Sequence, residues 1–279
     1  MTEHECEQLS AAPTGSLLEG PRWSAPSGRL SWIDIPTGRV FLLDPATEAI
    51  RSYDTGIAPL GAALPLAGGE FELVGAEGIY RWRPESTAQL IFRFDDGSEL
   101  ISNDANIDPW GRRYVGRMAA DEAQGAAELV AIEIDGSTRT VASGLTIPNG
   151  LAWSSDQSWL YFAESVEQRV YRVPTGAKGE SWHKREVLIQ HDSALPDGIC
   201  IGPDGNLWVA CFGGARVERY SLAGMKLGEY SLPVSQVTAC EFVGDDLYVT
   251  TAAEGFTELD WRREPLAGSL FRFRALSRA

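Results

Sequence analysis

The sequence predicts an all-β fold, a six-bladed β-propeller built from four-stranded antiparallel blades. Two observations carry this prediction. One strand–turn–strand unit recurs along the 279 residues, and its copies are spaced by 41 to 48 residues. A period in the forties that consists of short strands and turns is typical of propeller blades. No sustained helical periodicity interrupts the copies.

The clearest copy occupies residues 195–210, where a strand that opens on Asp197 leads through a Gly-Pro-Asp-Gly-Asn turn into an apolar strand. Related copies lie at residues 18–33, 102–116 and 148–162. The first residues of the inner strands then align as Glu19, Gly61, Asn103, Asn149, Asp197 and Thr238.

Six further strand-like runs follow these starts and predict outer strands. They lie at residues 39–43, 78–82, 129–134, 169–173, 215–220 and 269–273. Six starts and six outer runs predict six blades; a seven-bladed ring is the alternative, but the sequence has no seventh unit. The segment before Glu19 is expected to supply the outermost strand of the last blade, which closes the ring and removes a free edge.

No linker rich in Pro, Gly or Ser divides the chain, so residues 1–279 are expected to form a single domain. The excess of 39 acidic over 24 basic residues argues against nucleic acid and anionic membranes as partners. The acidic start at residues 1–7 does not resemble a signal peptide, and no apolar run is long enough to span a membrane. Four cysteines without a CxxC pair favour buried free thiols and a cytoplasmic location.

Residues at equivalent inner-strand positions should meet around the axis of a propeller. Four of the six positions, Glu19, Asn103, Asn149 and Asp197, carry side-chain oxygen and none is basic. Carboxylates that face one another without a positive charge repel, and a divalent cation would resolve this conflict. All-oxygen ligation suits Ca²⁺, Mg²⁺ or Mn²⁺, with Zn²⁺ as a further alternative. The competing interpretation is that these residues merely begin strands as turn formers.

The chain resembles the senescence marker protein (regucalcin), gluconolactonase and luciferin-regenerating enzyme family over its whole length. The resemblance rests on four motifs in a fixed order: Leu18-Glu19-Gly20-Pro21-x-Trp23, Asn103-Asp104 with Asp108-Pro109-x-Gly111-Arg112, Asn149-Gly150-Leu151-x-Trp153-Ser154, and Pro196-Asp197-Gly198 with Leu207-Trp208-Val209-Ala210-Cys211. It implies a six-bladed propeller that holds one divalent metal, Ca²⁺ as the first choice, and that often hydrolyses sugar lactones. It also implies Glu19, Asn149 and Asp197 as metal ligands, with Asn103 on the substrate or on a metal-bound water.

The expected activity is therefore metal-dependent hydrolysis of a lactone, a small cyclic ester. Asp197 would act as general base, although a carboxylate that also binds a metal is a weaker base. Two alternatives stay open: a hydrolase of phosphoesters or other esters on the same scaffold, and a calcium-binding propeller without catalysis. The sequence does not indicate an oligomeric state.

Two departures from the family pattern concern the substrate. Ile101 occupies a position where lactonases of this group commonly have an arginine that contacts the sugar. Arg117 is a candidate to replace that donor, or else a surface arginine, and Asp121 lies near a position where the family often binds substrate with an acid. A less polar lactone or another ester is therefore an alternative to an aldonolactone.

Overall fold

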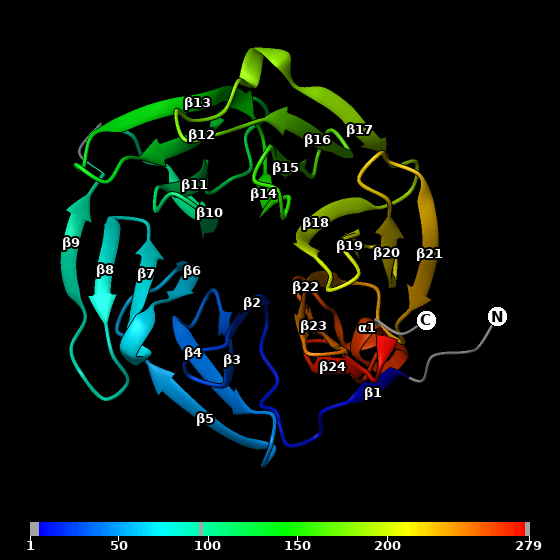
Figure 1. Cartoon of the computed structure of the whole chain (residues 1–279). Coiled ribbons are helices and arrows are strands. Elements are labelled where there is room, and N and C mark those ends of the chain that lie inside the picture. The colour runs from blue at the N-terminus through cyan, green and yellow to red at the C-terminus, as the bar shows by residue number, and fades with distance from the viewer. Residues whose placement is uncertain (1–5, 95–96, 277–279) are drawn as a thin grey trace.

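The structure, a computed structural model, describes residues 6–94 and 97–276. Its strands form six four-stranded sheets that stand around a central axis like the blades of a propeller (Figure 1). The prediction of a six-bladed, nearly all-β propeller is confirmed.

Five blades consist of four consecutive strands each, ordered from the axis outward. Blade 1 contains β2 (Leu18–Ser24), β3 (Arg29–Asp34), β4 (Arg39–Asp44) and β5 (Ala49–Asp54). Blade 2 contains β6 (Leu60–Pro65), β7 (Phe71–Gly75), β8 (Gly78–Trp82) and β9 (Gln89–Arg93). Blade 3 contains β10 (Ile101–Ile107), β11 (Arg113–Met118), β12 (Ala127–Ile132) and β13 (Thr138–Leu145). Blade 4 contains β14 (Pro148–Trp153), β15 (Trp159–Glu164), β16 (Arg169–Pro174) and β17 (Glu186–Gln190). Blade 5 contains β18 (Leu195–Ile201), β19 (Leu207–Phe212), β20 (Arg216–Tyr220) and β21 (Lys226–Ser231).

Blade 6 is assembled from both ends of the described chain. It contains β22 (Val237–Val243), β23 (Asp246–Thr251) and β24 (Leu270–Phe273), and β1 (Cys6–Gln8) pairs antiparallel with β24 as its outermost strand. The Glu7 carboxylate also pairs with the Arg272 guanidinium across this junction. The first strand therefore covers the edge that β24 would otherwise expose.

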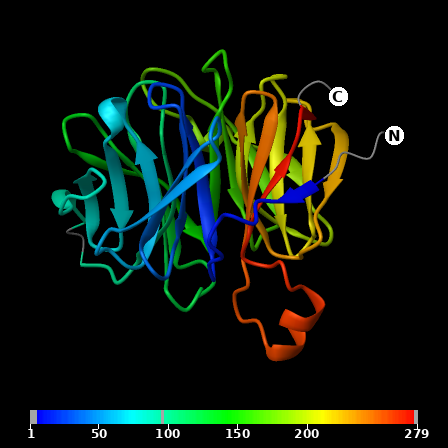
Figure 2. The same cartoon turned by 90° about the horizontal axis from the view of Figure 1, so that it is seen from below.

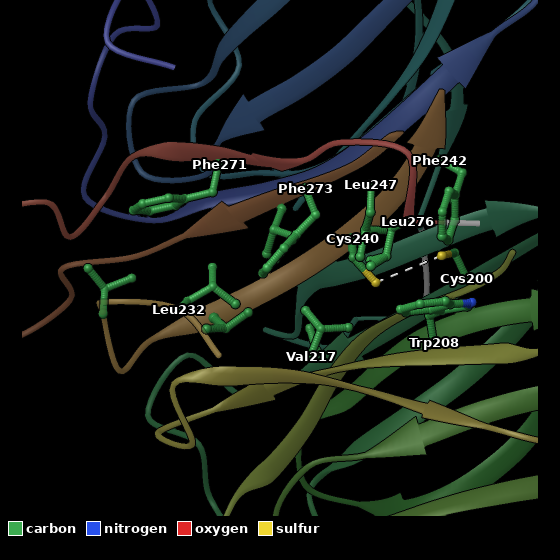
Figure 3. Close-up of a cluster of buried hydrophobic side chains, with 14 of the residues drawn as sticks. Cys200, Trp208, Val217, Leu232, Cys240, Phe242, Leu247, Phe271, Phe273 and Leu276 are labelled. Atoms are coloured by element: carbon green, nitrogen blue, oxygen red, sulfur yellow. Dashed lines mark hydrogen bonds between the residues drawn. The ribbon is translucent and has the colours of Figure 1, made fainter. Parts of the chain in front are cut away.

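Apolar side chains fill the space between neighbouring blades. Within the described residues they form six buried clusters, one at each junction between adjacent blades. Figure 3 shows the junction of blades 5 and 6, where Trp208 packs against Phe242 with ring centroids 5.1 Å apart. Cys200 and Cys240 meet in the same cluster with their sulfur atoms 3.8 Å apart.

Every inner strand is irregular near the end at which it begins. The pairing register between the inner strand and its neighbour shifts in all six blades, and the shifts span Asn103 in β10 and Asp197 in β18. A β-bulge turns a side chain away from the alternation of a regular strand. The bulges therefore give this end of the molecule freedom to direct polar side chains toward the axis.

Helical structure is confined to short segments. These are η1 (Ala67–Gly69), η2 (Trp182–Lys184) and α1 (Glu258–Arg263), the last of which begins with a capping box between Thr257 and Asp260. The connection that carries α1 projects from one end of the propeller (Figure 2). Across the described part of the chain, no helix is long and apolar enough to cross a membrane.

Candidate metal and substrate site at the channel mouth

A cavity of ≈ 310 Å³ lies at the end of the axis where the inner strands begin. Strands of blades 1, 3, 4 and 5 contribute to its lining, Pro59 reaches it from the connection before β6, and Glu254 reaches it from the connection that carries α1. The structure brings together in this lining the four predicted oxygen-bearing residues, Glu19, Asn103, Asn149 and Asp197.

Asp197 is the most deeply buried carboxylate of the cavity. It is 6% exposed, and its Oδ1 atom has no hydrogen-bond partner among the described residues. Burial, followed by the charges of Glu19 and Asp104, raises the pKa of Asp197 well above its ordinary value. A buried carboxylate oxygen without a donor is costly, so this atom is available to an added cation.

Glu19 faces the same cavity from blade 1. Its Oε2 atom accepts a hydrogen bond of 2.7 Å from the Gly20 amide. Withdrawal from water and the charge of Asp104 raise the pKa of Glu19 to about 8. Glu19 and Asp197 therefore disfavour each other's ionised forms, as expected for two buried carboxylates, and the charge of Arg22 offsets this only in part at Glu19.

The two amides are oriented by hydrogen bonds from their nitrogen atoms. Asn149 Nδ2 donates to Ser165 Oγ at 3.2 Å, and Asn103 Nδ2 donates to the Pro148 carbonyl at 3.1 Å. Ser165 Oγ in turn donates to the Pro196 carbonyl at 2.8 Å. With both amide nitrogens bonded to protein, the amide oxygens are left to face the cavity.

The other two repeat positions serve packing. A Cβ atom on Gly61 would lie 2.5 Å from the Ser102 carbonyl oxygen, so only glycine permits this approach of blades 2 and 3. Thr238 is fully buried and its hydroxyl donates to the Leu18 carbonyl at 2.6 Å, which joins blade 6 to blade 1. The four remaining positions are left to form the site.

Comparison with known proteins identifies the family of this chain. The family described as the SMP-30/Gluconolactonase/LRE-like region matches residues 17–253. The chain belongs to this family. The resemblance inferred from the four motifs is therefore confirmed.

Two curated relatives within the family share about a third of their residues with this chain. The putative sugar lactone lactonase YvrE of Bacillus subtilis is 31% identical, covering 94% of this chain and 92% of that protein. Regucalcin of Xenopus laevis is 32% identical with the same coverage, 94% and 92%.

Two solved structures have the same fold. The luciferin-regenerating enzyme superimposes with a TM-score of 0.87 at 26% identity, covering 96% of this chain and 94% of that one. A calcium-binding protein, regucalcin, from Agrobacterium tumefaciens gives a TM-score of 0.89 at 24% identity, covering 98% and 94%.

The structure does not bring Arg117 into the cavity. Arg117 is 2% exposed and lies opposite Glu128 in the ladder between β11 and β12, and its guanidinium donates to that carboxylate at 3.2 Å. It also lies over the Phe94 ring, 4.3 Å from the centroid. These contacts hold the Arg117 guanidinium within blade 3. Ile101 does line the cavity, so the position of Arg117 does not support the idea that it replaces the hydrogen-bond donor missing at Ile101.

Asp121 also lies outside the lining as the structure describes it. Its side chain is exposed in the turn after β11, where Oδ1 accepts a 3.2 Å hydrogen bond from the Ala123 amide. The neighbouring Glu122 lines the cavity instead, in the left-handed backbone region at φ 56°. The turn that the family pattern indicated therefore borders the cavity, with Glu122 and not Asp121 in the lining.

Glu254 and Asp104 are acidic groups of this region that the sequence reasoning did not identify. Burial and the charge of Glu122 raise the pKa of Glu254, and burial raises that of Asp104. Arg22 pairs with Asp104 at 3.1 Å on the inner side of the site, and it lines a separate cavity of ≈ 380 Å³ toward the opposite ends of the inner strands. The sequence does contain one indication of Asp104, because this residue directly follows Asn103, but the alignment of the repeats considered only the first residue of each inner strand.

A second group of possible ligands lies within blade 5. His191, Cys211 and Glu218 are buried with ligand atoms within 4.8 Å of one another. Arg216 and Lys226 already contact the Glu218 carboxylate at 2.7 and 2.6 Å, and several donors together hold its pKa at about 2. Because this carboxylate is already neutralised, the axial cavity is the better cation site.

Ser165→Ala is expected to weaken metal binding 10- to 100-fold, and also to lower the melting temperature of the metal-free protein because buried Ser165 Oγ bonds both Asn149 and Pro196. The substitution removes the oxygen that holds the Asn149 amide in position, and outer partners of ligands typically contribute this much. Calorimetric titration with Ca²⁺ measures the effect, and Ser158→Ala, a half-buried position in the turn between β14 and β15, is the control. Equal affinities for the two variants would contradict a positioning role for Ser165.

Proposed function

We propose that this protein is a metal-dependent hydrolase that opens a lactone ring, and that Glu19, Asn149 and Asp197 hold the ion. Membership in the gluconolactonase and regucalcin family supports a lactonase-type function. The observation that carries the proposal is the crowding of two carboxylates and two oriented amides in one cavity. Of the described residues that line it, none is Lys, Arg or His.

The donor set fits a divalent cation. Asp197 Oδ1 is buried without a partner within the described chain, and burial together with neighbouring carboxylates raises the pKa values of both Glu19 and Asp197. Ligands made of oxygen alone favour Ca²⁺, with Mg²⁺, Mn²⁺ and Zn²⁺ as alternatives. When bound, such an ion supplies Lewis acidity that polarises a carbonyl and lowers the pKa of water.

The residues of the chain supply binding, orientation and proton transfer. Asn103 presents its amide oxygen to a substrate hydroxyl or to the attacking water. Asp197 accepts a proton as the water oxygen bonds to the lactone carbonyl carbon. The bond from that carbon to the ring oxygen then breaks, and the proton passes to the ring oxygen, which leaves a hydroxy acid. Metal binding lowers the basicity of Asp197, so the test must establish its role as proton acceptor separately from its role as metal ligand.

The test is hydrolysis of a panel of lactones, simple esters and phosphoesters, followed with a pH indicator, by chelated protein reloaded with each of the four ions. Metal-dependent turnover that Asp197→Asn abolishes supports the lactonase, whereas turnover of phosphoesters alone would replace it with a phosphoesterase. Bound metal without turnover of any ester would instead favour a calcium-binding propeller. The proposal places the enzyme in the cytoplasm, in keeping with four free cysteines.

A further inference from the structure

We propose that the substrate is a neutral lactone with an apolar substituent, and not a polyhydroxylated or anionic lactone. This inference rests on the proposed lactonase function and concerns the walls of the same cavity. Three properties of the lining support this inference: its apolar area, the hydrogen bonds that its polar groups already make within the protein, and the charge of its rim.

Apolar side chains form most of the wall above the four oxygen-bearing residues. They are Leu17, Ile35, Pro36, Pro59, Ile101, Met118, Ala120, Ile147, Leu195 and Phe212. Most of them are half-buried, so they still present apolar surface to the cavity. Covering this surface with a hydrocarbon group removes it from water, which is worth about four-fold in affinity for each added methylene.

The polar groups of the wall have few donors left for sugar hydroxyls. Ser102 Oγ donates to the Gly75 carbonyl at 3.0 Å, and Ser165 Oγ donates to Pro196. The amide nitrogens of Asn103 and Asn149 each donate one of their two N–H groups to protein as well. The oxygen atoms of a polyhydroxylated substituent would therefore lose hydrogen bonds from water on entry and regain few from side-chain donors, which selects against it.

The rim of the cavity carries negative charge. Glu122 and Glu254 both line the cavity and are exposed, and the charge of Glu122 contributes to the raised pKa of Glu254. Since no lining residue in the described chain is cationic, no side chain offsets this charge for a phosphate or carboxylate on the substrate, and the charge of the proposed ion is already balanced by Glu19 and Asp197. The same repulsion favours departure of the product, because opening the ring creates a carboxylate.

The experiment measures kcat/KM for δ-lactones that carry alkyl chains of increasing length, for glucono-δ-lactone and for a phosphorylated aldonolactone, with one saturating ion. We expect kcat/KM to rise about three- to four-fold per methylene until the cavity is filled, and the alkyl lactones to exceed glucono-δ-lactone by at least about ten-fold. The phosphorylated compound should be the poorest substrate, and Glu122→Gln combined with Glu254→Gln should improve it more than it improves the neutral lactones.

Two variants of Ile101 form the matched pair. Ile101→Met keeps an apolar side chain of similar volume and should preserve the order of substrates. Ile101→Arg introduces a donor and a positive charge into the wall, and should shift the ratio of kcat/KM toward glucono-δ-lactone and the phosphorylated compound by at least about ten-fold. A ratio that is equal in the two variants would overturn the inference.

Binding provides a readout that does not depend on turnover. Alkyl δ-lactams resist hydrolysis, and calorimetry with the metal-loaded protein should show tighter binding as the alkyl chain grows. Equal affinity for alkylated and unsubstituted lactams, or a preference for glucono-δ-lactone in the kinetic series, overturns the apolar substrate while the lactonase stands. Failure to hydrolyse any lactone with any ion overturns the lactonase, and the lactam series still decides the character of the cavity.

Discussion

Asp197→Asn is expected to lower kcat/KM for lactone hydrolysis by at least about 1,000-fold and to remove most of the Ca²⁺ affinity. The change keeps the shape of the side chain but removes a ligand charge and the proposed general base together. It also removes one of the carboxylates that repel each other in the cavity. The metal-free variant should therefore melt at a higher temperature than the metal-free parent, and should gain little when Ca²⁺ is added.

Kinetics and thermal melting with and without Ca²⁺ check both halves of this prediction. Asp121→Asn is the control, because Asp121 lies on an exposed turn outside the cavity lining. Glu19→Gln should reproduce the loss of metal affinity, since it removes the other carboxylate. Full activity of Asp197→Asn, or a Ca²⁺-induced rise in melting temperature equal to that of the parent, would contradict the assignment of the site.

The pH dependence of stability should reverse when metal is bound. In the chelated protein the pKa of Glu19 is raised from 4.5 to about 8, so the folded state holds a proton that the unfolded state releases. This contribution to the free energy of unfolding is fully present below about pH 4.5 and is lost as the pH rises through about 8. The raised pKa of Asp197 acts in the same direction. We therefore expect the melting temperature of the chelated protein to fall between pH 5 and pH 9.

Metal binding should show the opposite trend, because the ion must displace these protons. The apparent Ca²⁺ affinity should rise by about ten-fold or more per pH unit between pH 6 and 7, and titrations in buffers of different ionisation enthalpy should detect proton release. Glu19→Gln should flatten both profiles. A Ca²⁺ affinity that is independent of pH would show that Glu19 and Asp197 are already ionised in the metal-free protein.

The ring and the four central residues could be predicted from the sequence because the repeat made them visible. Glu19, Asn103, Asn149 and Asp197 begin equivalent strands, and symmetry around an axis brings such positions together without any knowledge of side-chain contacts. Their hydrogen bonds could not be predicted in this way. The partner of Asn149, Ser165, lies after the second strand of the same blade and is not part of the repeat position.

The residues at the rim of the cavity could not be predicted from the sequence for a different reason. Glu122 and Glu254 belong to connections that differ from blade to blade, so no repeat indicates which residue of a turn faces inward. Arg117 illustrates the opposite case. It is close in sequence to residues that line the cavity, but the sequence does not show that its side chain pairs with Glu128 on the neighbouring strand of its own sheet. Pairing between strands decides such orientations, and it can be read only from the fold.

The shared construction of blade 6 has a consequence for the order in which the protein forms during synthesis. Blades 1 to 5 each use consecutive strands and can fold as the ribosome releases them, but Glu7 of β1 and its partner Arg272 of β24 are separated by 265 positions. At 5 to 20 residues per second, β1 waits roughly 10 to 50 s for its partner. Among the described strands, β1 is therefore made first but is the last to find its partner, and the ring closes only after β24 has been synthesised.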